Sequence, residues 1–355
     1  MSEQRTGKAT AALFEQVILR RLGASDADVL VGPKHGVDVG VVQVAPGVAM
    51  AVTTDPVFVV PAYGWERAAW FAVHILASDA ATSGLRLRWM AVDLNLPPEI
   101  SDQDLTSLWD AFSRTCDDLG IAVVTGHTAR YDGCAWPMVG GATCVALGPD
   151  DAYVTPTMAR PGDRVVVTKG AAIEATALFA ATFPDRLAAG VGAEVVRQAD
   201  ALFEQMTVVP ETRIAAAFGL RDRGVTSMHD ATEGGVVGGL LEVAVASDVG
   251  MRIDLDAIPV RPEVRVVCDH VGIDPYTSIS EGTLIATLRP DRAIGYVEAC
   301  AREGIDAAIV GDVTEPADGR VLVDGDGVER ALEHPGLDPF WGAFGAWASE
   351  AAVAG

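Results

Sequence analysis

Strand-like and helix-like patterns alternate along nearly the whole chain, and this alternation restricts the possible folds more than any other feature. Residues 38–58 hold two short apolar runs around a Pro-Gly turn, the pattern of a β-hairpin. Residues 101–120 carry a helical pattern with Ser101 as N-cap, Asp104 at the capping-box spacing and Gly120 as stop. Because hairpin-like strand pairs occur in the first half, we predict an α+β fold rather than one parallel sheet.

One segment rich in proline, aspartate and glycine, residues 149–163, separates two series of ordered patterns and is the best candidate for a linker. A chain of 355 residues is long enough for two domains. We therefore expect an N-terminal domain at 1–155, led by an amphipathic helix at 8–22. A C-terminal domain is expected at 156–335 and a tail at 336–355.

The composition limits the partners and the compartment. The net charge is −23, which argues against nucleic acid or an anionic membrane as the main partner, whereas an acidic surface suits magnesium. No uncharged apolar run reaches about 18 residues, so no membrane span is expected. The five cysteines are dispersed without a CxxC pair, which argues against zinc and fits a reducing compartment. With no signal-peptide pattern at the start, we expect a cytoplasmic protein.

The common nucleotide and hydrolase motifs are missing from the sequence. It contains no GxxxxGK[ST] and no GxGxxG after a strand, and it also lacks HExxH and GxSxG. P-loop, Rossmann, zinc-protease and α/β-hydrolase interpretations therefore have no sequence support, and any nucleotide site must be of another kind.

Four aspartates, Asp38, Asp55, Asp79 and Asp230, each end or follow an apolar run. Taken singly, such a residue is usually a helix cap or a solvated side chain. If the four converge, their oxygens could hold Mg²⁺ and connect it to the phosphates of ATP.

Residues 227–244, SMHDATEGGVVGGLLEVA, place polar side chains and a Gly-Gly pair directly before an apolar helical run. Two interpretations remain open for this stretch. Asp230 or Thr232 could cap the helix. Alternatively, Thr232, Gly234 and Gly235 could form a phosphate or metal-phosphate edge at the helix N-terminus.

Three further polar segments have both a structural and a functional interpretation. Residues 124–133 could be an exposed hairpin turn or part of a site, and 279–282 could be a plain turn before a strand. The segment at 168–174 could be a strand-to-helix loop, or it could carry a phosphate-facing lysine and a polar group near substrate. The candidate side chains in these segments are His127, Thr128, Arg130, Lys169, Glu174 and Glu281.

Six short segments, in this chain order, resemble those of the aminoimidazole-ribonucleotide (AIR) synthase superfamily, which is also called PurM-like. They are VDVGVV, TTDPVF, LASDAATSG, TGHTAR, HDATEGGVVGGLLEVA and SEGTLIA. The superfamily includes AIR synthase, formylglycinamidine synthase, thiamine-monophosphate kinase, selenide water dikinase and HypE-type hydrogenase-maturation dehydratases. The resemblance covers about residues 30–330.

The resemblance implies a two-domain PurM-like fold, with an N-terminal mixed sheet that forms a homodimer and a C-terminal α/β sandwich. It implies that ATP and Mg²⁺ bind in a cleft between domains and subunits. The implied metal ligands are Asp38, Asp55, Asp79 and Asp230. The implied nucleotide-binding residues are Thr54, Thr128, Arg130, Thr232, Gly234 and Gly235. The implied catalytic residues are His127, Lys169, Glu174 and Glu281.

Within the superfamily, the Lys-Gly-x-x-Ile-Glu segment and the order of elements are most similar to HypE-like proteins. Two features differ: no cysteine follows Cys300, and His127 and Ala129 stand where HypE-type loops have Asp and Lys. We therefore expect no thiocyanate at the chain end, and an acceptor that is a separate small molecule or protein. The expected function is ATP-dependent phosphoryl transfer that activates an amide, carboxamide or phosphate oxygen. The alternatives are a non-catalytic nucleotide-binding partner in maturation and a thiamine-monophosphate-kinase-like enzyme.

Overall fold

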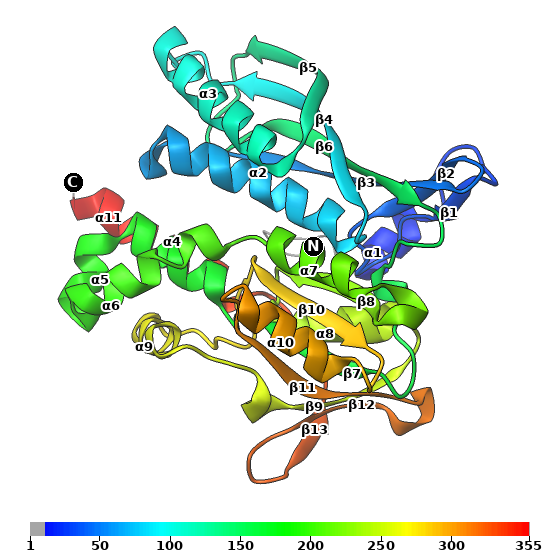
Figure 1. Ribbon diagram of the computed structural model, residues 1–355. Coiled ribbons are helices and arrows are strands. Elements are labelled where there is room, and N and C mark those ends of the chain that lie inside the picture. The colour runs from blue at the N-terminus through cyan, green and yellow to red at the C-terminus, as the bar shows by residue number, and fades with distance from the viewer. Residues whose placement is uncertain (1–10, 355) are drawn as a thin grey trace.

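The computed structural model describes residues 11–354, and within them two mixed sheets are packed with helices (Figure 1). The six-stranded sheet belongs to the N-terminal half and the seven-stranded sheet to the C-terminal half. The predicted α+β class is confirmed. No helix within residues 11–354 combines the length and the apolar character needed to cross a bilayer.

The N-terminal sheet has the strand order β1-β2-β3-β6-β4-β5, with β4 and β5 parallel and the other neighbours antiparallel. Its strands are β1 (Val29–Val31), β2 (Gly40–Ala45), β3 (Val48–Phe58), β4 (Arg86–Leu96), β5 (Ala122–Arg130) and β6 (Met138–Pro149). The hairpin predicted at 38–58 is the β2–β3 pair. The second possible hairpin, around residues 124–133, does not form. Strand β4 lies between β5 and β6, and β5 is left at the edge of the sheet.

Two helices, α2 (Trp65–Thr82) and α3 (Asp102–Leu119), pack against each other and cover one face of this sheet (Figure 1). The predicted ends of α3 are confirmed. The Ser101 hydroxyl accepts a hydrogen bond from the Asp104 N–H at 3.0 Å, and Gly120 ends the helix with φ 76°. Alanines such as Ala69 and Ala77 are fully buried, and their small side chains bring α2 close to the sheet.

The C-terminal sheet has the order β13-β12-β9-β11-β7-β10-β8. Its strands are β7 (Arg164–Thr168), β8 (Val225–Ala231), β9 (Gly250–Asp254), β10 (Thr283–Leu288), β11 (Ala307–Thr314), β12 (Arg320–Val323) and β13 (Glu329–Ala331). Around them lie α7 (Val209–Phe218), α8 (Gly235–Ala246) and α10 (Ala293–Arg302). In the antiparallel β8–β10 pair, Ala231 lies opposite Thr283, so the end of β8 and the start of β10 meet at the same edge.

A helical layer flanks the C-terminal sheet and includes the end of the chain. It consists of α4 (Ile173–Thr182), α5 (Pro184–Val191), α6 (Ala193–Asp200), α9 (Pro262–Val271) and α11 (Pro339–Ala354). The expected tail at 336–355 therefore contains a packed helix. The rings of Phe340, Phe344 and Trp347 lie 5.4–5.5 Å from that of Phe179 on α4.

The leading helix expected at residues 8–22 is only partly within the described residues. Residues 8–10 lie outside them. Helix α1 (Ala11–Leu13) continues into one π-helical stretch, Phe14–Ile18, and no helix follows to residue 22.

Candidate active site

A cleft of about 670 Å³ lies between the two domains and receives side chains from both. This volume is within the range of small-molecule sites, roughly 300–1,000 Å³. The cleft has an acidic part and an apolar part. Aromatic side chains from both domains line the apolar part: Phe58, Tyr63, Phe71, Trp136, Phe340, Trp341 and Phe344.

The structure brings most of the sequence-predicted site residues to this cleft. Those that line it are Asp38, Thr54, Asp55, Asp79, Glu174, Thr232 and Glu281. The Asp230 carboxylate lies within 4.8 Å of a ligand atom of Asp38, and the side chain is only 1% exposed. Asp38 lies just before β2, Asp55 near the end of β3, Asp79 in the last turn of α2 and Asp230 near the end of β8.

Carboxyl groups interact directly with one another in the acidic part. The Asp79 carboxyl group is hydrogen-bonded to that of Asp55, and it also accepts a hydrogen bond from Thr53 Oγ1 at 2.9 Å. Burial raises the pKa of Asp79 well above its ordinary value, and the charges of Asp230 and Asp55 raise it further. A cation bound among these oxygens would relieve the repulsion.

Glu281 and Glu174 form a second acidic pair in the cleft. The Glu281 N–H donates to Glu174 Oε2 at 3.0 Å. Burial raises the pKa of Glu174 to about 7, and burial followed by the charges of Asp230 and Glu174 raises that of Glu281. Glu281 is 3% exposed, and its Oε1 has no hydrogen-bond partner within the described chain. A buried oxygen of this kind is an available ligand or proton acceptor.

The glycine pair at the start of α8 adopts left-handed backbone conformations, with φ 85° at Gly234 and 63° at Gly235. A Cβ on Gly235 would lie 2.6 Å from the Ser278 carbonyl oxygen, so a larger residue does not fit. Gly234 itself occupies the N-cap position, and the capping interpretation of Asp230 and Thr232 is therefore wrong.

The N-terminus of α11 is tied to this glycine loop. Asp338 accepts hydrogen bonds from the N–H groups of Gly234 at 2.7 Å and Phe340 at 2.9 Å. Trp341 Nε1 donates to Glu233 Oε1 at 2.8 Å. The last helix thus positions the loop and also lines the apolar part of the cleft.

The structure places Lys169 outside the cleft, in contrast to the phosphate-facing role expected for it. The side chain is buried, and its Nζ lies 2.5 Å from Glu211 Oε1. It also donates to the carbonyl oxygens of Thr207 at 2.6 Å and Gly282 at 2.8 Å. These contacts use its hydrogen-bonding capacity, so Lys169 is a structural ion-pair partner.

Three other predicted site residues lie on the exposed edge strand β5 and do not line this cleft: His127, Thr128 and Arg130. His127 Nε2 is 2.9 Å from the Tyr131 hydroxyl, and Arg130 pairs with Asp102 at 2.6 Å.

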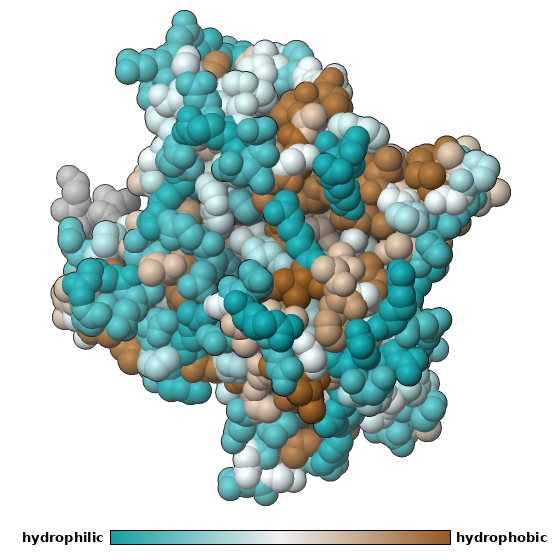
Figure 2. Space-filling model, in the orientation of Figure 1, coloured by the Kyte–Doolittle hydropathy of each residue, from teal (hydrophilic) through white to brown (hydrophobic). Residues whose placement is uncertain are grey.

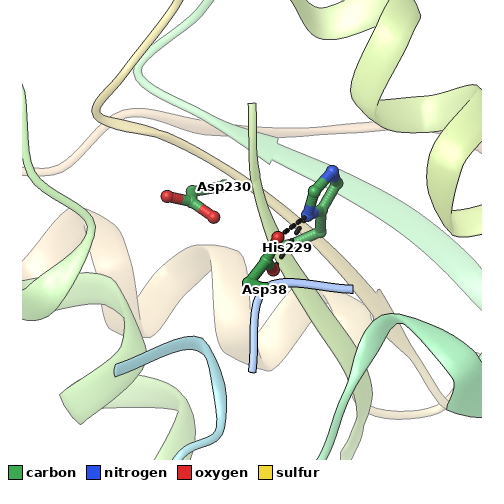
Figure 3. Close-up of side chains that lie close together, drawn as sticks. All are labelled: Asp38, His229 and Asp230. Atoms are coloured by element: carbon green, nitrogen blue, oxygen red, sulfur yellow. Dashed lines mark hydrogen bonds and ion pairs between the residues drawn. The ribbon is translucent and has the colours of Figure 1, made fainter. Parts of the chain in front are cut away.

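His229, within the polar stretch 227–244, was not among the predicted site residues. Its Nδ1 lies 2.9 Å from the Asp38 carboxylate (Figure 3). Its Nε2 lies 2.9 Å from Glu242 Oε2. Burial alone lowers the pKa of His229, but the two carboxylates outweigh burial and raise it well above its ordinary value. Asp338 was also missed, although an aspartate followed by Pro339 at the start of a helical run is a recognisable helix start.

The donor set fits magnesium better than a transition metal. Asp38, Asp55, Asp79, Asp230 and Glu281 offer carboxylate oxygens, the ligands that Mg²⁺ prefers. Asp38, His229 and Asp230 have potential ligand atoms within 4.8 Å of one another. Both ring nitrogens of His229 already contact carboxylates, which leaves the oxygens as the ligands.

Two family models together match most of the chain. The model of the AIR synthase related protein, N-terminal domain, matches residues 36–159, and that of the C-terminal domain matches residues 160–324. The chain belongs to the AIR synthase related family, the PurM-like superfamily. Among its relatives, the chain is similar to proteins named carbamoyl dehydratase HypE.

Individual relatives span most of the chain at moderate identity. Carbamoyl dehydratase HypE of Rhizobium leguminosarum bv. viciae is 28% identical over 276 residues, which cover 76% of this chain and 74% of that protein. The Escherichia coli K12 protein of the same name is 27% identical, covering 83% and 85%. The crystal structure of E. coli HypE matches with a TM-score of 0.68 at 25% identity, covering 82% of this chain and 87% of that one. A HypE structure in complex with ATP has the same fold, with a TM-score of 0.64 at 22% identity, covering 94% and 97%.

Proposed function

We propose that the protein is an ATP- and Mg²⁺-dependent enzyme that activates an amide, carboxamide or phosphate oxygen by phosphoryl transfer. One observation carries this proposal. The cleft is lined by seven carboxylates, and no lysine or arginine lines it within the described residues. Triphosphate could not enter such a site without divalent cations, which carboxylates bind and which phosphates share.

In this proposal, the residues of the acidic part have different roles. Asp38, Asp55, Asp79 and Asp230 would hold magnesium, which neutralises charge on the phosphoryl group when bound. Glu174, with a pKa of about 7, is matched to accept a proton from the acceptor near neutral pH. The aromatic part of the cleft would bind the organic portion of nucleotide or acceptor.

The relatives support this class of activity. Proteins named carbamoyl dehydratase span most of the chain, and a structure of the same fold was solved with ATP. A further matching structure, at 18% identity, is a HypE–HypF complex. That complex supports a protein partner, and a second candidate function is therefore binding of nucleotide and a protein partner without turnover. ADP formation separates the two functions.

We also propose that the protein is a homodimer joined through its N-terminal sheet. Strand β5 is an unpaired edge, with Val123 and Val124 exposed. In Figure 2, hydrophobic residues gather over the strands of this sheet. Dimerisation there would place His127, Thr128 and Arg130 at the interface, where they could complete the partner's cleft. A cytoplasmic location without membrane or nucleic-acid partners remains part of the proposal.

Substitution of Asp79 by asparagine tests the proposed function. Asp79 contacts both Asp55 and Thr53, so Asp79→Asn should remove most Mg-ATP binding and ADP formation. At about 100 times the dissociation constant, wild-type binding should add roughly 2.7 kcal/mol of stability, and this gain should vanish in the variant. The control is Asp163→Asn, because Asp163 is a buried aspartate, 5% exposed, that does not line the cleft. Equal binding of Mg-ATP by wild type and Asp79→Asn in calorimetry would contradict the assignment.

A further inference from the structure

The loop that carries Asp38 belongs to the N-terminal domain but rests on α8 of the C-terminal domain. Lys34 Nζ donates to the Ala246 carbonyl oxygen at the end of α8, at 2.6 Å. Gly36 lies so close to the helix that a Cβ there would be 2.7 Å from the Cβ of Glu242. Its φ of 71° is also a conformation that glycine adopts most readily.

The His229 side chain connects the Asp38 carboxylate to Glu242 on α8. Its Nδ1 lies 2.9 Å from each Asp38 oxygen and its Nε2 2.9 Å from Glu242 Oε2. The ring is 2% exposed, so water does not compete for either contact. In Figure 3 the Asp38 carboxylate points at the imidazole, and that of Asp230 lies to one side.

We propose that His229 is a positioning residue that fixes the Asp38 carboxylate for metal binding and fastens residues 32–39 to α8. The consequence for magnesium rests on the proposed function, whereas the consequence for the loop does not. We call the contacts of His229 with Asp38 and Glu242 the clasp. Because Asp38 comes from one domain and Asp230 from the other, the clasp sets the distance between two ligands that no single domain could bring together.

A direct metal-ligand role for His229 is the competing assignment. A neutral histidine ligates a metal through a nitrogen lone pair, and its other nitrogen donates a hydrogen bond. Here both nitrogens face carboxylates at 2.9 Å, the arrangement of a double donor. A ligand role would require Asp38 or Glu242 to move away.

Hydrogen exchange and magnesium titration on His229→Asn test the clasp. The matched control is His74→Asn, because His74 is also buried and does not line the cleft. Within residues 11–354, Thr207 is its one side-chain hydrogen-bond partner. In nucleotide-free protein, amide exchange across residues 32–39 should accelerate by about tenfold or more in His229→Asn and stay unchanged in His74→Asn. The magnesium concentration that half-saturates ATP binding should rise by a similar factor.

A second pair of variants guards against simple misfolding. Glu242→Gln keeps an oxygen that can accept from His229 Nε2 and should stay close to wild type, whereas Glu242→Ala should reproduce His229→Asn. Unchanged exchange of residues 32–39 in both His229→Asn and Glu242→Ala would overturn the clasp. If wild type fails to bind Mg-ATP, the proposed function fails, and the exchange data still decide the clasp. If binding is intact and exchange is unaltered, only the clasp fails.

Discussion

At the scale of single residues, the acidic part of the cleft is costly to fold without a cation. Asp79 and Glu281 are both more basic than ordinary carboxyls, because burial and neighbouring carboxylates disfavour their charged forms. Such clusters persist at functional sites, where ligand binding offsets their cost to stability. Glu174 offers the most direct measurement of this cost, because its pKa of about 7 lies within an accessible range.

Glu174→Gln should stabilise the nucleotide-free protein at high pH. The unfolded glutamate ionises near 4.5 and the folded one near 7, so the free energy of unfolding falls as pH rises from 4.5 to 7. Above pH 7 the full cost is present, up to roughly 3 kcal/mol. Urea denaturation at pH 5 and pH 8 should therefore show a gain for Glu174→Gln mainly at pH 8. The exposed control Glu333→Gln should change little, and an equal gain at both pH values would argue against a buried acid.

At the scale of elements, several local signals predicted the structure correctly, whereas pairings between distant segments could not be predicted. The β2–β3 hairpin and both ends of α3 follow from neighbouring residues, and they form as predicted. The insertion of β4 between β5 and β6 depends on pairing between strands far apart in sequence, for which no local pattern exists.

The same distinction applies to the candidate site. The carboxylate segments could be named from the sequence because each stands at the end of an apolar run. The ion pair between Lys169 and Glu211 joins residues far apart along the chain, and no local pattern separates a structural lysine from a phosphate-binding one. The contact of α11 with the glycine loop depends likewise on tertiary packing.

Asp338→Ala should loosen α11 and lower stability. Asp338 is 2% exposed and accepts two backbone N–H groups, so its removal leaves buried donors unsatisfied at a cost of about 1–3 kcal/mol. Chemical denaturation would measure this loss. Asp324→Ala is the matched control, because Asp324 also accepts two backbone N–H groups, but in an exposed turn where water can replace it. Equal losses in both variants would contradict a special role for Asp338.

At the scale of the whole molecule, the cleft exists only because two domains meet. Asp38, Asp55 and Asp79 come from the N-terminal half, and Asp230 and Glu281 come from the C-terminal half. Helix α2 carries Asp79 and also packs on α7 and β8. The same helix therefore contributes to the core of the N-terminal domain and to the contact between the domains. Strand β5 is the edge of the N-terminal sheet, at the end opposite β1.

Light scattering should give twice the chain mass of 37.0 kDa at micromolar concentration. Val124 is 58% exposed on the edge strand, and Val124→Lys should shift the protein toward monomer because a lysine there opposes pairing. Val266→Lys, on the exposed face of α9, should leave the mass unchanged. A monomeric wild type would refute the dimer.

The hydrogen bond between Asp79 and Asp55 also has a consequence for heat measurements. Burial, followed by the charge of Asp230 and the contact with Asp55, raises the pKa of Asp79, and this favours its protonated form in the cation-free protein. A divalent ion entering the cleft competes for the same oxygens, so metal uptake expels hydrogen ions into solution. The buffer takes up these hydrogen ions, so its ionisation enthalpy contributes to the heat of every calorimetric metal titration of this protein. Titrations in phosphate and in Tris will consequently report different heats for the same binding event. The difference between the two heats gives the number of hydrogen ions released.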